Sequence, residues 1–143
     1  MKCLKTPILF FISVTLAAFL AACSGSPPPK GEGKVKALVG SDGVQRATIT
    51  AGSYYFDPSR IVAKVNMPLE LTLKKEKGMT PHSFVLKDAA AGFDVELSLT
   101  EAPKMVKLNP TKVGEFKFWC GERLLFFESH QEKGMVGFLE VTE

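Results

Sequence analysis

Short runs in which apolar and polar residues alternate are the feature of this sequence that most restricts its fold. They recur through residues 45–143 and are clearest at Leu69–Lys74, Val95–Thr100 and Phe116–Cys120. Alternation with a period of two is typical of strands that bury one face. Turn signals separate the runs, among them Asp57-Pro58, Asn66-Met67-Pro68, Ala91-Gly92, Asn109-Pro110 and Val113-Gly114. This part of the chain is therefore expected to be built from strands.

The remaining candidate strands lie at 47–50, 60–65, 82–87, 104–108 and 136–141. Seven or eight short strands at this spacing predict an all-β fold, an antiparallel Greek-key β-sandwich. Residues 45–143 show no convincing long amphipathic helix and no internal repeat.

Residues 1–22 have the composition of a secretory signal peptide. Lys2 and Lys5 precede an apolar run that is short for a membrane span and ends in small residues. Leu20-Ala21-Ala22-Cys23 resembles the lipobox of bacterial lipoproteins, which implies cleavage before Cys23 and its acylation with palmitate-type chains. Several acyl chains anchor a protein stably where one is marginal. The alternatives are a plain signal peptide with an incidental cysteine and a retained anchor helix.

A segment rich in Gly, Ser, Pro and Lys follows, from Cys23 to Val44, and is typical of a flexible tether. The sequence thus predicts a signal peptide at 1–22, a tether at 23–44 and one domain at 45–143. The chain has 18 Lys and Arg against 15 Asp and Glu, and loss of Lys2 and Lys5 lowers its net charge from +3 to about +1. A net charge this small does not indicate binding to nucleic acid or to acidic lipid.

Cys120 is the most informative cysteine. Cys3 leaves with the predicted signal and Cys23 is the predicted acylation site, so Cys120 remains as a single free thiol in an exported protein. An intramolecular disulfide is then impossible. Two interpretations stay open: a buried structural cysteine, or a thiolate ligand of a metal.

The predicted strands bring Cys120 towards the two histidines of the chain. Cys120 and His82 each share a strand face with large apolar residues, so both are expected to point inward. His130 and Met135 come just before the last strand, and the end of one antiparallel strand lies beside the start of its neighbour. A thiolate, two imidazoles and a thioether form the ligand set of a blue-copper site. The alternative is that the histidines are ordinary packing residues.

With these residues the domain resembles a cupredoxin. Phe118-Trp119-Cys120 followed by His130-Gln-Glu-Lys-Gly-Met135 is similar to the plastocyanin-like ligand loop, and Pro81-His82-Ser83-Phe84 resembles the strand that supplies the first histidine. The resemblance covers residues 45–142. It implies one copper ion that cycles between Cu(I) and Cu(II), with a thiolate, two imidazoles and a weak axial thioether as ligands: Cys120, His82, His130 and Met135.

Two positions depart from the plastocyanin-like pattern. Nine residues separate Cys120 from His130, many more than in that pattern, so the segment must loop out and return. Glu122 or Glu128 is an alternative ligand in place of His130 and would give a harder, less blue site. Ser83 stands where the family often has an Asn that joins the two ligand loops, so the tuning of the metal should differ.

The run Leu124-Leu125-Phe126-Phe127 lies inside the long segment and has two interpretations. It packs inward as a lid on the sandwich, or it stays exposed beside His130 as an apolar surface on which a redox partner docks. Tyr54, Tyr55 and Phe56 are predicted to be core residues.

The sequence therefore predicts a copper-binding lipoprotein that carries electrons and is not an enzyme, because two histidines leave no catalytic triad or second metal cluster to place. The alternatives are a copper chaperone and a metal-free interaction module. The expected partners are the membrane, through lipidated Cys23, and a transient redox or copper-exchange protein, with the domain a monomer. The expected location is the cell envelope; by resemblance to Gram-negative lipoproteins, Ser24 after the cysteine favours the outer membrane, facing the periplasm.

Overall fold

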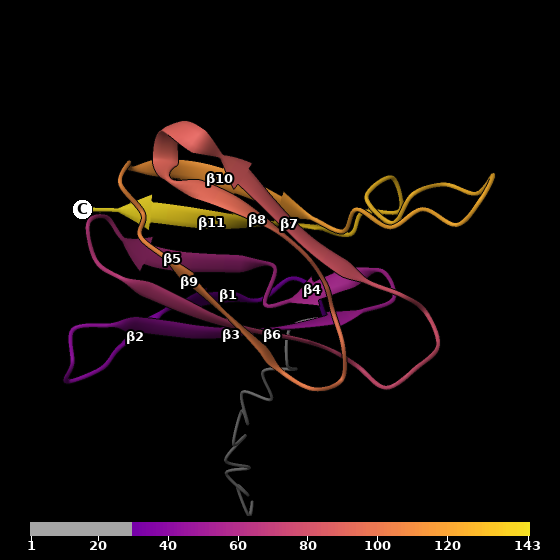
Figure 1. Cartoon of the computed structure of the whole chain (residues 1–143), viewed down its shortest axis with the longest axis horizontal. Coiled ribbons are helices and arrows are strands. Elements are labelled where there is room, and N and C mark those ends of the chain that lie inside the picture. Colours follow the sequence, from indigo (N-terminus) through magenta and orange to yellow (C-terminus); the bar gives the residue numbers. More distant parts are fainter. Residues whose placement is uncertain (1–29) are drawn as a thin grey trace, which may run out of the picture.

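The computed structural model describes residues 30–143, so the predicted signal peptide, Cys23 and the first residues of the predicted tether lie outside the described part. Two β-sheets pack face to face (Figure 1). One sheet has the strand order β1-β5-β11-β10-β7-β8, and the other has β2-β3-β6-β9 with β4 paired to β3. The bounds are β1 Lys34–Lys36, β2 Leu38–Val39, β3 Gln45–Gly52, β4 Tyr55–Asp57, β5 Arg60–Lys64, β6 Leu69–Lys75, β7 Ser83–Asp88, η1 Ala89–Ala91, β8 Phe93–Ser98, β9 Lys104–Leu108, β10 Gly114–Trp119 and β11 Val136–Thr142.

The predicted all-β sandwich is confirmed, and each predicted strand is present within two residues of its expected bounds. The strand directions are more mixed than expected. The pairs β1–β5, β5–β11 and β3–β6 run parallel, and the other pairs run antiparallel. Alternation reports which face of a strand is buried and carries no information on the direction of its neighbour. Among residues 30–143, no helix is long and apolar enough to cross a membrane.

Two short strands lie inside the segment predicted to be a tether. β1 pairs with β5, β2 pairs with β3, and the N–H of Ala37 between them donates to the carbonyl of Val62 at 2.8 Å. The folded part therefore begins before residue 45, and the predicted boundary is too late. The side chains of β1 and β2 are exposed. These strands are held by backbone hydrogen bonds, which leave no apolar pattern in the sequence.

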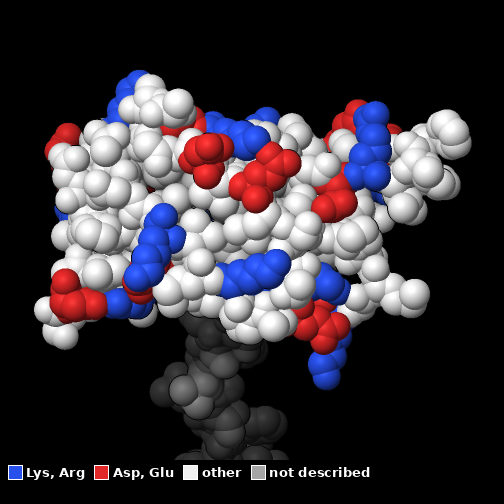
Figure 2. Space-filling view, viewed as in Figure 1, with Lys and Arg blue, Asp and Glu red and all other residues white. Residues whose placement is uncertain are grey.

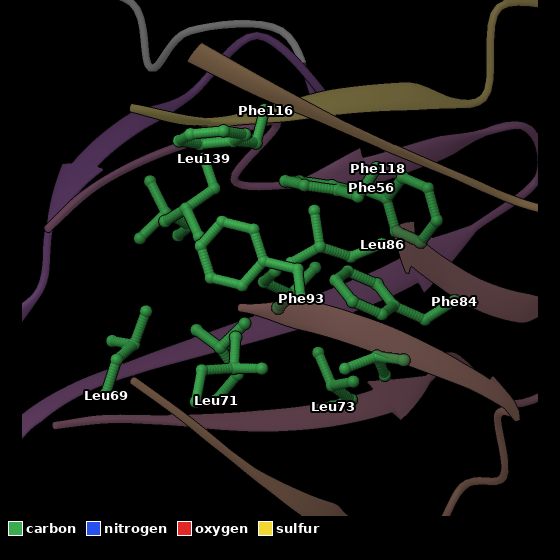
Figure 3. Close-up of a cluster of buried hydrophobic side chains, with 14 of the residues drawn as sticks. Phe56, Leu69, Leu71, Leu73, Phe84, Leu86, Phe93, Phe116, Phe118 and Leu139 are labelled. Atoms are coloured by element: carbon green, nitrogen blue, oxygen red, sulfur yellow. The ribbon is translucent and has the colours of Figure 1, made fainter. Parts of the chain in front are cut away.

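The core between the sheets is filled by aromatic and leucine side chains (Figure 3). Phe118 meets Phe56 edge to face with ring centroids 5.2 Å apart. The centroid of the Phe84 ring lies 5.0 Å from that of Phe118. Aromatic contacts of this kind add to the stabilisation from burial. Of the predicted core residues at 54–56, Phe56 is fully buried, whereas Tyr54 and Tyr55 are half-buried.

Gly137 makes room for the Phe118 ring. The two residues are register partners on β11 and β10. A Cβ at Gly137 would overlap the Phe118 ring and come within 2.5 Å of the Ser59 carbonyl oxygen. Since Phe118 precedes Cys120 by two residues, this glycine helps to fix the end of the strand that carries the cysteine.

We expect Gly137→Ala to lower the free energy of unfolding by about 1–3 kcal/mol, because the added methyl group overfills a packed core. Urea unfolding followed by circular dichroism measures this effect. Gly33→Ala is the matched control, since the nearest atom to its added Cβ lies 3.3 Å away. An equal loss in both variants would mean that the Phe118 contact does not set the cost.

Candidate metal centre

Three strand ends converge at one end of the sandwich. β10 ends at Trp119, so Cys120 is the first residue beyond it, and β7 begins at Ser83, directly after His82. β10 and β7 run antiparallel, with Trp119 opposite Val85, which places the end of one beside the start of the other. Trp119 is also opposite Val136, the first residue of β11.

The donor atoms of His82, Cys120 and His130 lie within 4.8 Å of one another. The Cys120 sulfur lies 4.0 Å from Nδ1 of His82 and 3.4 Å from Nδ1 of His130. The two imidazole rings have centroids 5.1 Å apart. The cysteine is fully buried and each histidine is 4% exposed. Three of the four residues predicted as ligands are thus brought together with their nitrogen and sulfur atoms facing one another.

Met135 is joined to the same three-residue group through the backbone. Its carbonyl accepts the N–H of Cys120 at 3.2 Å, and its N–H donates to the carbonyl of His130 at 2.9 Å. The Met135 side chain is fully buried. The fourth predicted residue is therefore buried directly beside this group and is linked to Cys120 and His130 by backbone hydrogen bonds.

Contacts between its two ends close the long loop between Cys120 and His130. We call these contacts the neck of the loop. The N–H of His130 donates to the carbonyl of Glu122 at 3.0 Å, and Arg123 forms an ion pair with Glu132 at 2.9 Å. Ser129 and Glu132 exchange hydrogen bonds in the pattern of a capping box, which starts a turn just before His130. These contacts allow the nine-residue segment to return so that the His130 imidazole lies beside the Cys120 sulfur.

The carboxylate alternative to His130 is not supported by this arrangement. Among the described residues, the cluster of potential metal donors contains His130 and neither Glu122 nor Glu128. Glu128 is exposed. A soft nitrogen–sulfur donor set is present instead of a harder carboxylate one.

Tyr54 is a contact of the centre that the sequence did not reveal. Its ring meets the His130 ring edge to face, with centroids 4.7 Å apart. The ammonium group of Lys133 lies over the Tyr54 ring, 4.4 Å from its centroid, and donates a hydrogen bond to the Tyr54 hydroxyl oxygen at 3.3 Å. Tyr54 is distant from both residues along the chain, so no local pattern could have identified it. It supports His130 on the solvent side.

Ser83 joins the two loops that carry His82 and Cys120. Its hydroxyl oxygen accepts the N–H of Gly121 at 2.9 Å and lies 3.9 Å from the Cys120 sulfur. Its backbone N–H also points at that sulfur, at 3.4 Å. Hydrogen bonds to a ligand sulfur tune the metal and fix the ligand. Ser83 thus makes the link between the loops that the sequence had left in question.

We expect Ser83→Ala to lower the reduction potential of the copper-loaded protein, because a donor that stabilises the electron-rich sulfur is lost. Unfolding should become easier by about 1 kcal/mol, since the Gly121 N–H loses its partner. Voltammetry and urea unfolding measure the two effects. Ser98→Ala is the matched control: Ser98 faces Ser83 across the β7–β8 pair but is exposed. Equal potentials in the two variants would contradict a role for the hydroxyl.

Burial keeps both imidazoles neutral. Burial, with smaller contributions from His130 and Lys75, lowers the pKa of His82 to about 4. Burial also lowers the pKa of His130; Glu122 opposes this shift and Lys133 adds to it. A histidine must be neutral to bind a metal. Both side chains are therefore in the ligand form at neutral pH.

The run Leu124–Phe127 is exposed, and the inward-packed lid considered for it is wrong. The four side chains are between 58% and 102% exposed, with Phe126 the most exposed. A short turn forms the end of the loop, where the N–H of Phe127 donates to the carbonyl of Leu124 at 3.0 Å. At the base lies a pocket of about 540 Å³, whose walls include Leu124, Phe127 and His130. We call Leu124–Phe127 the apolar tip.

The donor set fits a copper ion. A thiol sulfur and imidazole nitrogens of two neutral histidines lie within 4.8 Å of one another, and the buried Met135 adjoins them along the backbone. Soft sulfur with imidazole is the set that selects copper among the biological metals when one axial sulfur ligand is weak. The hydrogen bonds to the Cys120 sulfur and the packing around the rings hold these groups in place.

Known proteins were compared with this chain in sequence and in structure. The family model described as cupredoxin-like domain matches residues 11–136. No curated protein matches the sequence significantly. Among solved structures, the fold is similar to the metal-binding domain, with Cu(I), of the Cu(I)-exporting P-type ATPase CopA of Streptococcus pneumoniae D39. That match has a TM-score of 0.60 and 20% identity and covers 80% of this chain and 100% of that one.

Two further structures share the fold at still lower identity. Dithionite-reduced auracyanin from Roseiflexus castenholzii has a TM-score of 0.55 and 13% identity, over 68% of this chain and 97% of that one. The periplasmic domain of cytochrome oxidase subunit II from Bradyrhizobium japonicum has a TM-score of 0.54 and 17% identity, over 68% and 83%. At these identities the likeness concerns the fold.

Proposed function

Because the chain belongs to the cupredoxin-like domain family, whose cofactor is copper, we propose that it is an electron carrier with one type 1-like copper site. The proposed ligands are His82, Cys120, His130 and the weak axial Met135. The observation that carries this proposal is the buried cluster of one thiol and two neutral imidazoles within 4.8 Å.

The protein would hold the ligand side chains in fixed positions and give a redox partner access to one of them. Copper supplies the one-electron couple when it is bound. His82 and Cys120 sit at the ends of paired strands, and Ser83 ties their loops together. His130 is held by Tyr54 and by the neck of its loop, and it is the ligand that lines the open pocket. Donor atoms that are fixed in one arrangement need little movement when the charge of the metal changes. Because His130 lines the pocket beside the apolar tip, we assign it as the ligand through which the electron leaves.

We further propose that the protein is a lipoprotein of the cell envelope, acylated at Cys23 and, in a Gram-negative cell, held at the outer membrane facing the periplasm. The lipobox-like sequence at 20–23 supports this proposal. Its partner would be a protein that gives or takes one electron, met in a transient contact.

The test is to load the chain from Ser24 to Glu143 with Cu(II) and to record visible absorption and electron paramagnetic resonance spectra. An intense thiolate band with narrow copper hyperfine splitting is expected, followed by fast, reversible one-electron exchange in stopped-flow mixing with a small redox protein. Weak, ordinary copper spectra would overturn the assignment. A thiolate band combined with slow electron exchange and rapid release of Cu(I) to a chelator would indicate copper delivery instead.

A further inference from the structure

The apolar tip projects from the end of the molecule that holds the metal centre. Figure 1 shows the loop between β10 and β11 reaching beyond both sheets. In Figure 2, the same end is an uncharged knob with charged side chains of both signs behind it. Leu125 is 77% exposed and Phe126 is 102% exposed. Large apolar side chains that are exposed next to one another are typical of a surface that binds another protein or a membrane.

The start of the described chain limits how far the domain can lie from the membrane that would anchor Cys23. Lys30 forms an ion pair with Glu76 at 2.9 Å. Seven residue steps separate Lys30 from Cys23, so a lipid-bearing Cys23 stays within about 25 Å of that ion pair. Because β1 also fixes the chain from Lys34, the free segment after Cys23 is much shorter than the tether predicted for residues 23–44.

Glu76 belongs to the same end of the molecule as the apolar tip. Met79 follows it by three residues, within about 10 Å along the chain, and is fully exposed. Met79, Leu124 and Phe127 line one pocket. The N-terminal attachment at Glu76 is therefore within a short chain distance of Met79, which shares a pocket with the base of the apolar tip and His130.

The basic side chains beside the apolar tip are already engaged within the protein. Arg123 is paired with Glu132, and Lys133 contacts the Tyr54 ring and hydroxyl. This arrangement does not suit binding through electrostatic attraction to acidic headgroups. It suits insertion of apolar side chains at the boundary between headgroups and acyl chains.

We propose that the apolar tip inserts into the lipid bilayer that anchors Cys23 and turns the metal centre towards the membrane surface. The inference rests on the proposed lipidation and copper function. It makes the redox partner a membrane-embedded protein, met by diffusion in two dimensions with His130 near the headgroups.

The test is flotation of the unlipidated chain from Ser24 to Glu143 with phosphatidylcholine vesicles, at low and high salt. We expect salt-insensitive binding that weakens tenfold or more in the double variant Leu125→Ser/Phe126→Ser, since each side chain buries a large apolar area. The double variant Leu38→Ser/Val39→Ser is the control. It removes two exposed apolar residues from β2, on the other sheet.

Two results would overturn the proposal: no flotation of the wild-type chain, or equal flotation of the two double variants. If flotation is absent and the tip variant slows electron exchange with an added soluble redox protein, the surface is a protein-docking site. The thiolate band of each copper-loaded variant is recorded in parallel. A chain that floats without this band keeps the membrane proposal and loses the copper one, and mass spectrometry of the processed N-terminus tests lipidation separately.

Discussion

Cys120→Ser is expected to abolish the visible thiolate-to-copper absorption of the copper-loaded protein and to leave the sandwich folded. The band arises from the sulfur, and an alcohol oxygen is a poor ligand for this type of copper site. The fold should persist because the smaller side chain fits the space, and its oxygen can accept the N–H that Ser83 now points at the sulfur. Absorption spectroscopy and thermal unfolding measure the two outcomes.

The control for this experiment is the same substitution at Cys23. Cys120 is the free cysteine of the described residues, and Cys23 lies outside them. Cys23→Ser should keep the band at full intensity while it removes the acylation site. A Cys120→Ser protein that retained the band would show that the sulfur ligand is elsewhere and would end the copper assignment.

Phe118→Ala is expected to cost about 3–5 kcal/mol of unfolding free energy, the largest loss we predict for a single core substitution. The ring is 1% exposed and contacts Phe56 and Phe84 in the centre of the core. Gly137, opposite it, has no side chain to fill the space left behind. Urea unfolding of the metal-free protein measures the loss.

Phe138→Ala is the matched control, one residue further along β11. Phe138 is half-buried, and its ring carries the Arg60 guanidinium 5.0 Å from its centroid. Its removal should cost far less than removal of Phe118. Similar losses at both positions would contradict the assignment of Phe118 to the centre of the core.

The sequence was sufficient to predict the sandwich and the meeting of Cys120 with the two histidines at one end of it. Alternation located the strands because each buries one face, so the pattern of Leu69 to Lys74 reports a local property. Cys120 and His82 could be placed at strand ends for the same reason. The proposed ligand set came from residue chemistry, since the chain has only two histidines and one cysteine outside the predicted signal peptide and acylation site.

Long-range pairing was not readable in the same way. The parallel pairs of β3 with β6 and β5 with β11 join segments far apart in sequence, and β1 and β2 are held by backbone bonds without an apolar pattern. Tyr54 could not be assigned to the centre because it contacts His130, a residue far away along the chain.

The loop after Cys120 shows most clearly the difference between what the local sequence determines and what the tertiary structure determines. Residue types alone determined that the segment carries a histidine, a methionine and four large apolar residues. Only the tertiary structure decided that the backbone contact at Glu122 returns His130 to the Cys120 sulfur, and that Leu124–Phe127 points outward. Local sequence fixes what a side chain prefers to contact. Which surface is still free to be contacted depends on every other strand being in place, and a nine-residue loop has too little local structure of its own to decide it.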